Sequence, residues 1–127
     1  MGYAFGDMGF SQDELDVIDR AREVDIETHG ATGSHRATVW AIVDRGAVFV
    51  RSYYGPRSRW YREALADPAV AIAVDGRRVP ATASPATDPH SIERTSAGLS
   101  RKYAGDPATP RMNRAEVLDL TLRLDRA

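Results

Sequence analysis

The sequence predicts an α+β domain built on a small antiparallel β-barrel. Six short segments are rich in β-branched and other apolar residues, two tight-turn signals join neighbouring segments into hairpins, and few helical segments separate them. So few crossover helices favour antiparallel pairing. A chain of 127 residues is long enough for one core, and six short strands bury their apolar face best when the sheet curls into a barrel.

The first predicted helix covers residues 12–22 and begins at a capping box. Ser11 is the N-cap and Glu14 lies three residues later, so each side chain can accept a hydrogen bond from the other residue's backbone N–H. Alternation of apolar and acidic residues then predicts a short strand over residues 24–28. We expect residues 29–35, which contain two glycines and several small polar residues, to form a loop.

The middle of the chain predicts a hairpin followed by a short helix. Residues 36–44 and 47–53 are dense in β-branched and aromatic types, and the Arg-Gly pair at 45–46 is a turn signal. A glycine and a proline then end the strand, and Ser58 can cap a helix over residues 59–66.

The last third predicts a second hairpin, a long helix and a final strand. The strands cover residues 69–74 and 77–86, and the Asp-Gly pair between them is a favoured hairpin turn. An Asp-Pro pair begins a helix that runs from residue 89 to about residue 103. Strict alternation of leucine with polar residues marks residues 118–125 as the clearest strand in the chain.

Composition excludes several classes of protein. The net charge of −1 argues against a dedicated nucleic-acid binder, which usually carries a basic surface. No apolar run approaches the ~18 residues that span a bilayer, and residues 1–10 lack the features of a signal peptide. There is no cysteine, which excludes disulfides and cysteine-ligated metals. We therefore expect a cytoplasmic protein without a membrane or nucleic-acid partner.

The segment from Arg51 to Arg62 is the most informative for function. It contains four arginines and no acid, and every basic residue of the chain except Lys102 is an arginine. Arginines beside a helix N-terminus suit a phosphate or carboxylate, and flat aromatic side chains suit a planar ring. The plainer alternative is a solvated arginine face over an ordinary helix. The aromatic residues of the segment are Tyr53, Tyr54, Trp60 and Tyr61.

The order of these motifs resembles the split β-barrel flavoproteins, the superfamily of pyridoxamine phosphate oxidases and deazaflavin-dependent nitroreductases. In that superfamily a hairpin strand ends in a small polar residue, and a glycine loop, a basic or polar cluster opening a short helix, and an apolar strand follow. The matching segments are residues 49–52, Gly55, residues 58–61 and residues 65–70. The resemblance covers residues 11–125 and implies one domain over residues 1–127, a six-stranded antiparallel split β-barrel with peripheral helices.

More narrowly, the chain is similar to an uncharacterised family of small bacterial proteins within this superfamily. That family carries Arg-x-Thr followed by Trp in one strand, here Arg36, Thr38 and Trp40, with the Trp one residue closer than in the family pattern. Val-Arg-Ser at residues 50–52 and Arg-Trp-Tyr at residues 59–61 complete the match.

The resemblance also implies a site. Arg36 would donate to a phosphate or a ring edge, Ser52 would be the family's polar residue, and Arg59 would be the cationic phosphate clamp, where flavin mononucleotide oxidases typically have a lysine. The loop at residues 53–57 departs from both branches of the superfamily. The implied cofactor-binding residues are Arg36, Thr38, Arg51, Ser52, Arg57, Ser58, Arg59 and Trp60, and the implied substrate pocket contains Trp40 and Tyr54.

This resemblance implies an oxidoreductase that binds FMN or a 5-deazaflavin coenzyme, transfers hydride to a small organic substrate, and forms a homodimer. No catalytic side chain is assigned, because hydride transfer is the chemistry of the cofactor. Two alternatives remain open at this stage. One is a cofactor-free barrel that binds or transforms a small molecule without redox chemistry, and the other is an interaction module without a small-molecule site.

Other candidate sites are weaker. The three histidines have no zinc-like spacing, so we expect no metal site. No Gly-x-Ser-x-Gly motif is present, and the glycines near residue 30 lack the strand, turn and helix context of a dinucleotide-binding loop.

Overall fold

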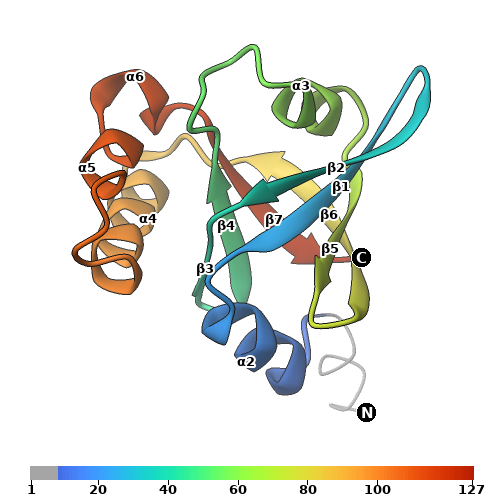
Figure 1. The fold of residues 1–127 in the computed structure, drawn as a ribbon, viewed down its shortest axis with the longest axis horizontal. Helices are drawn as coiled ribbons and strands as arrows, with labels where there is room; N and C mark the ends of the chain where they lie inside the picture. The colour runs from blue at the N-terminus through green and yellow to red at the C-terminus, as the bar shows by residue number, and fades with distance from the viewer. Residues whose placement is uncertain (1–8) are drawn as a thin grey trace.

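Seven antiparallel strands form one curled sheet in the computed structural model, which describes residues 9–127 (Figure 1). The sheet order is β2-β1-β5-β6-β7-β4-β3, and the sheet closes into a half-barrel. The strands are β1 (Val24–Gly30), β2 (Gly33–Val39), β3 (Ala41–Asp44), β4 (Ala47–Arg51), β5 (Ala69–Val74), β6 (Arg77–Pro85) and β7 (Thr121–Arg126).

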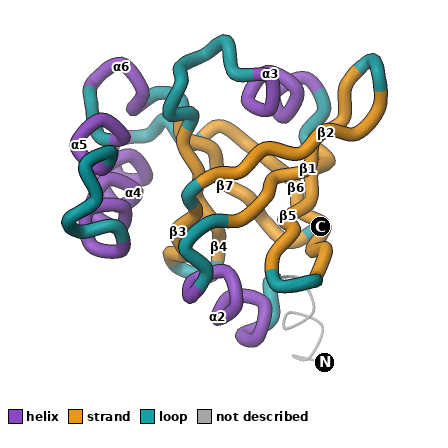
Figure 2. Tube along the Cα trace, viewed as in Figure 1, coloured by secondary structure: helices purple, strands orange, loops and turns teal. Residues whose placement is uncertain are grey.

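The helices lie around this half-barrel rather than between its strands (Figure 2). Helix α3 packs over β1, β2 and β6, while α2 and α4 pack against β3. Helices α5 and α6 lie beside α4 on the same side of the sheet (Figure 1). The helices of the described residues are α2 (Gln12–Arg20), α3 (Arg59–Ala66), α4 (Pro89–Lys102), α5 (Thr109–Met112) and α6 (Ala115–Leu118).

The α+β antiparallel barrel prediction is confirmed, but the strand count of six is wrong. The predicted strand over residues 36–44 is two strands, because the chain bends at Trp40 between β2 and β3. Strand β2 pairs with β1 at one edge of the sheet, and β3 pairs with β4 at the opposite edge. One straight strand could not reach both edges, so the bend is required by the closure of the sheet.

The predicted loop over residues 29–35 is also wrong for most of its length. Strand β1 continues to Gly30 and β2 begins at Gly33, leaving a two-residue turn at the tip of a long hairpin. Gly33 has a φ of +112°, a conformation that side chains rarely adopt. The glycines therefore shape a tight hairpin rather than a long loop.

Two hydrophobic clusters occupy opposite faces of the β3–β4 hairpin. The larger cluster fills the inside of the curled sheet, and Val17 and Ile18 of α2 and Ala64 of α3 pack into it. The smaller cluster lies under α4 and α5, where Phe49 of β4 and Leu99 of α4 are buried together. Because both its faces are covered, every residue of β4 is buried, which explains its unbroken apolar run.

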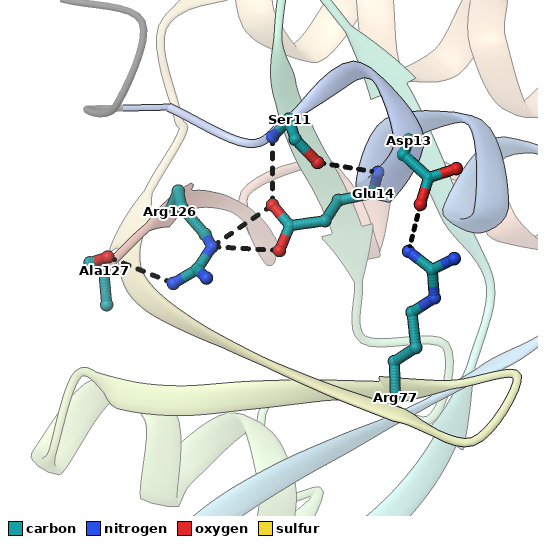
Figure 3. Close-up of polar contacts among 6 residues, drawn as sticks. All are labelled: Ser11, Asp13, Glu14, Arg77, Arg126 and Ala127. Carbon is teal, nitrogen blue, oxygen red and sulfur yellow. Dashed lines mark hydrogen bonds and ion pairs between the residues drawn. The ribbon is translucent and has the colours of Figure 1, made fainter.

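The start of α2 is fixed by the predicted capping box and by a long-range ion pair (Figure 3). The Ser11 hydroxyl accepts a hydrogen bond from the Glu14 N–H at 3.0 Å, and the Ser11 N–H donates to Glu14 Oε1 at 2.9 Å. The same carboxylate pairs with Arg126 of β7, with Nε 3.2 Å from Oε1. Nearby, Arg77 of the β5–β6 hairpin pairs with Asp13 at 2.6 Å. These contacts tie α2 to two distant segments of the sheet.

The single lysine links α4 to two other elements. Lys102 Nζ donates to the carbonyl of Ala41 in β3 at 2.7 Å and to the carbonyl of Ile18 in α2 at 3.3 Å. Burial lowers the pKa of this amine. The C-terminal end of α4 is thereby joined to the barrel by a charged side chain whose partners are backbone carbonyls.

Among residues 9–127, no helix has both the length and the apolar character needed to cross a bilayer. The sequence-based expectation about a signal peptide falls mainly on residues 1–8, which lie outside the described residues.

The Glu14–Arg126 ion pair predicts a pH-dependent contribution to stability. Burial alone would raise the pKa of Glu14, but the Ser11 N–H and Arg126 outweigh it and hold the pKa below its usual value. Because the folded pKa is the lower one, the stabilisation is present above the unfolded pKa and is lost as the pH falls through the folded pKa. Glu14→Gln keeps a capping acceptor and removes the charge, so we expect the free energy of unfolding at neutral pH to fall by about 0.5–1 kcal/mol.

Urea unfolding at neutral pH and near pH 3, followed by tryptophan fluorescence, measures this difference. Wild type and E14Q should converge at the acidic pH. Asp13→Asn is the matched control, because Asp13 is mostly exposed and its pair with Arg77 should contribute less. Equal stability of wild type and E14Q at neutral pH would contradict the assignment.

Candidate functional site

Two adjoining cavities open where β2, the loop after β4 and α3 meet. The first, which we call the aromatic cavity, has a volume of about 280 Å³, and its walls include Trp40, Tyr53, Tyr54, Trp60, Arg51 and Met112. The second, which we call the arginine cleft, has a volume of about 250 Å³ and is lined by His35, Arg36, Ala37, Thr38, Tyr54, Ser58, Arg59 and Trp60. Thr38, Tyr54 and Trp60 line both, so the two cavities share one wall.

The arginine cleft offers hydrogen-bond donors that the described residues leave unused. Ser58 is the N-cap of α3, but its hydroxyl makes no capping hydrogen bond. Arg59, the first residue of α3, is exposed, and its guanidinium has no ion-pair partner within residues 9–127. A free hydroxyl, a free guanidinium and a helix N-terminus in one cleft form a donor set suited to an anion.

Arg36 enters the same cleft from β2 and is held only weakly. Its Nη2 lies 3.5 Å from Oε1 of Glu27. That carboxylate is already paired with Arg78, whose Nε and Nη2 lie 3.0 and 2.5 Å from Oε2. The hydrogen bond from Arg78 is the main reason that the pKa of Glu27 is lowered. Since one carboxylate faces two guanidinium groups, a positive charge remains on this side of the cleft.

The aromatic cavity has a rigid wall. The ring of Trp40 stacks on that of Tyr103, with centroids 3.9 Å apart and planes within 5°. Tyr103 is 2% exposed, its hydroxyl donates to the Arg22 carbonyl at 2.8 Å, and burial raises its pKa to about 12. Tyr103 therefore acts as a core residue that holds the Trp40 ring in place. Tyr54, which is 85% exposed, lines both cavities and stands at their boundary.

Arg51 also lines the aromatic cavity, but its side chain lies inside the protein. The residue is 1% exposed. Its Nε donates to Thr121 Oγ1 at 2.8 Å, Nη1 contacts three oxygens within 3.1 Å, and Nη2 donates to the Ile92 carbonyl at 3.2 Å. All these acceptors are neutral, and within the described part of the chain no carboxylate pairs with Arg51. Burial lowers its pKa to about 10, so the charge persists at neutral pH.

The structure brings together most of the residues that the sequence singled out, but not all. Eight of the ten line one or both cavities: Arg36, Thr38, Trp40, Arg51, Tyr54, Ser58, Arg59 and Trp60. Ser52 lies outside both linings, is fully buried, and donates its hydroxyl to the Gly55 carbonyl at 2.6 Å. Arg57 is exposed in the loop before α3 and also lies outside both linings.

Sequence reasoning missed a polar cluster at the end of the arginine cleft. Glu63 of α3 accepts a hydrogen bond from Thr28 Oγ1 at 2.8 Å and lies 3.0 Å from Nδ1 of His35, while Nε2 of His35 lies 3.0 Å from Thr32 Oγ1. Burial would raise the pKa of Glu63, but the bonds to Thr28 and His35 outweigh it and lower the pKa. The β1–β2 register, which pairs Thr28 with His35, is the signal that sequence alone did not supply.

Gly30 is required by this cluster. A Cβ atom at Gly30 would overlap the Glu63 carboxylate. The absence of a side chain therefore leaves room for the Glu63 carboxylate to reach Thr28 and His35. Within residues 9–127, no three acidic or histidine side chains are grouped as metal ligands.

Comparisons with known proteins agree with the predicted resemblance. The model of a family described as "Uncharacterized protein conserved in bacteria (DUF2255)" matches residues 14–124. None of the curated proteins compared with the chain matches it.

Solved structures show the same fold. An F420 reductase is 18% identical, with a TM-score of 0.64 over 87% of this chain and 90% of the other. A pyridoxamine 5′-phosphate oxidase-like protein from Listeria innocua is 12% identical, with a TM-score of 0.60 over 89% and 88%. HutZ, the heme storage protein from Vibrio cholerae, is 14% identical, with a TM-score of 0.64 over 91% and 89%. Identities this low establish the barrel fold and not the activity.

The Arg51 contacts predict a large structural effect of its removal. Arg51→Met keeps much of the side-chain length but leaves buried acceptors, including the carbonyls of Ile92 and Met112, without a donor. We expect the free energy of unfolding to fall by about 2–3 kcal/mol in urea titrations. Arg57→Met, at an exposed position, is the control and should change it by less than about 0.5 kcal/mol. Similar values for the two variants would show that the Arg51 hydrogen bonds contribute little.

The close approach at Gly30 gives a second prediction. Gly30→Ala should displace Glu63 and break its bonds to Thr28 and His35, so the urea midpoint should decrease and the NMR signals of the His35 ring should move. Gly9→Ala is the control, since a Cβ there meets no atom within 4 Å. An unchanged His35 ring spectrum in G30A would refute the proposed overlap.

Proposed function

This chain belongs to the bacterial family DUF2255, and we propose that it binds a phosphorylated flavin or 5-deazaflavin coenzyme and transfers hydride between that coenzyme and a small organic substrate. The observation that carries the proposal is the shared wall of the two cavities. An anion site and a flat aromatic site lie side by side, separated only by Thr38, Tyr54 and Trp60. A coenzyme with a phosphate at one end and a planar ring at the other matches this pair of sites.

The residues present fit such a coenzyme at its charged end. Arg59, the Ser58 hydroxyl and the N-terminus of α3 would hold the phosphate, because their donors are not used within the described residues. Arg36 adds a second guanidinium from β2, since Arg78 already neutralises most of the Glu27 charge. Trp60 and Tyr54 would contact the planar ring at the boundary of the cavities.

When bound, the coenzyme supplies the hydride chemistry itself. The chain then has three tasks: to hold the phosphate, to orient the ring, and to keep water from the reacting face. Trp40 suits the second task, because its stacking on buried Tyr103 fixes the plane of its ring. Tyr54 suits the third, because it stands exposed at the mouth of both cavities.

We further propose that the protein acts as a cytoplasmic homodimer. The resemblance to split-barrel flavoproteins supports the dimer, and the open outer edge of β2 beside the arginine cleft leaves room for a second copy to complete the site.

A cofactor-free barrel is the second candidate. Arg36 is in contact with Glu27, so it is not wholly available to a coenzyme phosphate. In this case the aromatic cavity alone would bind a small molecule, and the arginine cleft would have no part in binding.

A visible absorption spectrum tests the two candidates. We expect the purified protein, mixed with FMN or a 5-deazaflavin coenzyme and freed of excess, to retain the chromophore. Arg59→Ala should raise the dissociation constant at least about tenfold, because it removes a charge-assisted hydrogen bond. Arg62→Ala on the same helix is the matched control, since Arg62 lines neither cavity.

A protein that retains neither compound, or that binds equally well with and without the Arg59 guanidinium, would overturn the coenzyme proposal. Retention of heme instead, seen as a Soret band after addition of hemin, would point to a role like that named for HutZ.

A further inference from the structure

A buried positive charge that no described residue neutralises lies beside the aromatic cavity. Arg51 forms part of its lining and carries its charge into the protein interior, where all its hydrogen-bond acceptors are neutral. A buried cation without a counter-ion is costly, because it has lost its hydration and has gained no opposite charge. Any anion that enters the cavity would therefore be attracted more strongly than it would be by a surface arginine.

The guanidinium also retains an unused donor. It has five N–H bonds, two of them on Nη2, and Nη2 makes a single hydrogen bond, to the Ile92 carbonyl. One N–H of Nη2 is thus without an acceptor among the described residues. Internal hydrogen bonds fix the position of this group, so it needs no rearrangement to attract a ligand.

Other charges around the cavity reinforce Arg51. Arg114 lies over the ring of Tyr53 at 5.5 Å and donates to the Tyr53 carbonyl at 2.8 Å, and no described carboxylate pairs with it. Arg22 lies over Trp40 but is paired with Asp106. Glu23 is the acidic residue in the lining, and it is exposed to solvent, where its charge is screened. The balance inside the cavity is therefore positive.

We propose that the aromatic cavity binds a planar small molecule that carries a carboxylate, and that this aromatic or conjugated acid is the substrate. Its ring would lie against Tyr53 and Met112, in the part of the cavity that the coenzyme ring leaves free, and its carboxylate would face Arg51. The substrate role rests on the proposed function, whereas the preference for an anion rests on the charges of the cavity alone.

Two probes of equal size and different charge test the anion preference. trans-Cinnamate is anionic at neutral pH, and trans-cinnamamide has the same planar shape without the charge. Trp40 and Trp60 are the two tryptophans of the chain and both line the cavity, so intrinsic fluorescence reports binding directly. We expect wild-type protein, without added coenzyme, to bind cinnamate at least tenfold more tightly than cinnamamide. Equal affinities, a tighter amide, or no binding of either probe at millimolar concentration would overturn the proposal.

Charge variants locate the source of the preference. Arg51→Met should bring the two dissociation constants to within about twofold of each other. Arg114→Met, which leaves the internal hydrogen bonds of Arg51 in place, should weaken cinnamate severalfold and leave cinnamamide unchanged. Glu23→Gln is the opposite-sign control and should tighten cinnamate only. If R51M does not fold, the wild-type ratio and the R114M and E23Q shifts still decide the question, and unchanged cinnamate binding in both would count against the cavity charge.

The coenzyme spectrum and the cinnamate titration test the proposed function and the anion preference independently of each other. A preference for cinnamate without retention of coenzyme would support the anion-binding cavity and refute the redox function. A protein that retains coenzyme but shows no preference between the probes would keep the redox function and exclude an acid as its substrate class.

Discussion

One guanidinium connects the barrel to its helical side. Arg51 is the last residue of β4, and its hydrogen bonds reach Thr121 on β7, the Ile92 carbonyl on α4 and the Met112 carbonyl on α5. These elements are about 40 to 70 residues away along the chain. The other contacts of α4 with the barrel are the apolar cluster around Phe49 and the polar contacts of Arg94 and Lys102 with β3. The aromatic cavity depends on that attachment, because Met112 and Ala108 form one of its walls.

The same constraint explains why an uncompensated charge lies beside a cavity with apolar walls. Neutral acceptors satisfy the geometry of the guanidinium but not its charge. A carboxylate in their place would have removed the positive potential from the cavity. The Arg51 hydrogen bonds therefore stabilise the packing of α4 and α5 on the barrel, and the charge that they leave uncompensated favours anions in the cavity.

Local signals in the sequence predicted most of the elements correctly, and long-range pairing accounts for the errors. The Ser11 capping box and the Asp88–Pro89 helix start are decided within a few residues, and both are confirmed. The division of β2 from β3 at Trp40 depends on which edge of the sheet each half joins, which periodicity does not report. Proline is usually found in edge strands, yet Pro80 lies in β6, inside the sheet. That position is tolerated because Pro80 lies one residue beyond the last β6–β7 pair, where its missing N–H removes no bond of that ladder.

The residues of the candidate site divide in the same way, into those that local sequence identifies and those that only the fold brings together. Arg59, Ser58 and Trp60 are neighbours in sequence, so the arginine and aromatic segment was visible before the fold was known. The sequence showed four arginines between residues 51 and 62 but not their directions, and the structure has Arg51 buried and Arg57 exposed. Glu63 could not have been singled out, because its partners come from a hairpin about 30 residues away.

Lys102 has a chemical consequence for labelling and modification of this protein. It carries the chain's one side-chain amine, and that amine is half-buried and donates to two backbone carbonyls. An acyl group on Nζ would remove the charge and displace one or both of these bonds. Amine-directed reagents and lysine-acylating enzymes would thus find no readily accessible target among the side chains, and acylation of Lys102 would require the end of α4 to separate from β3.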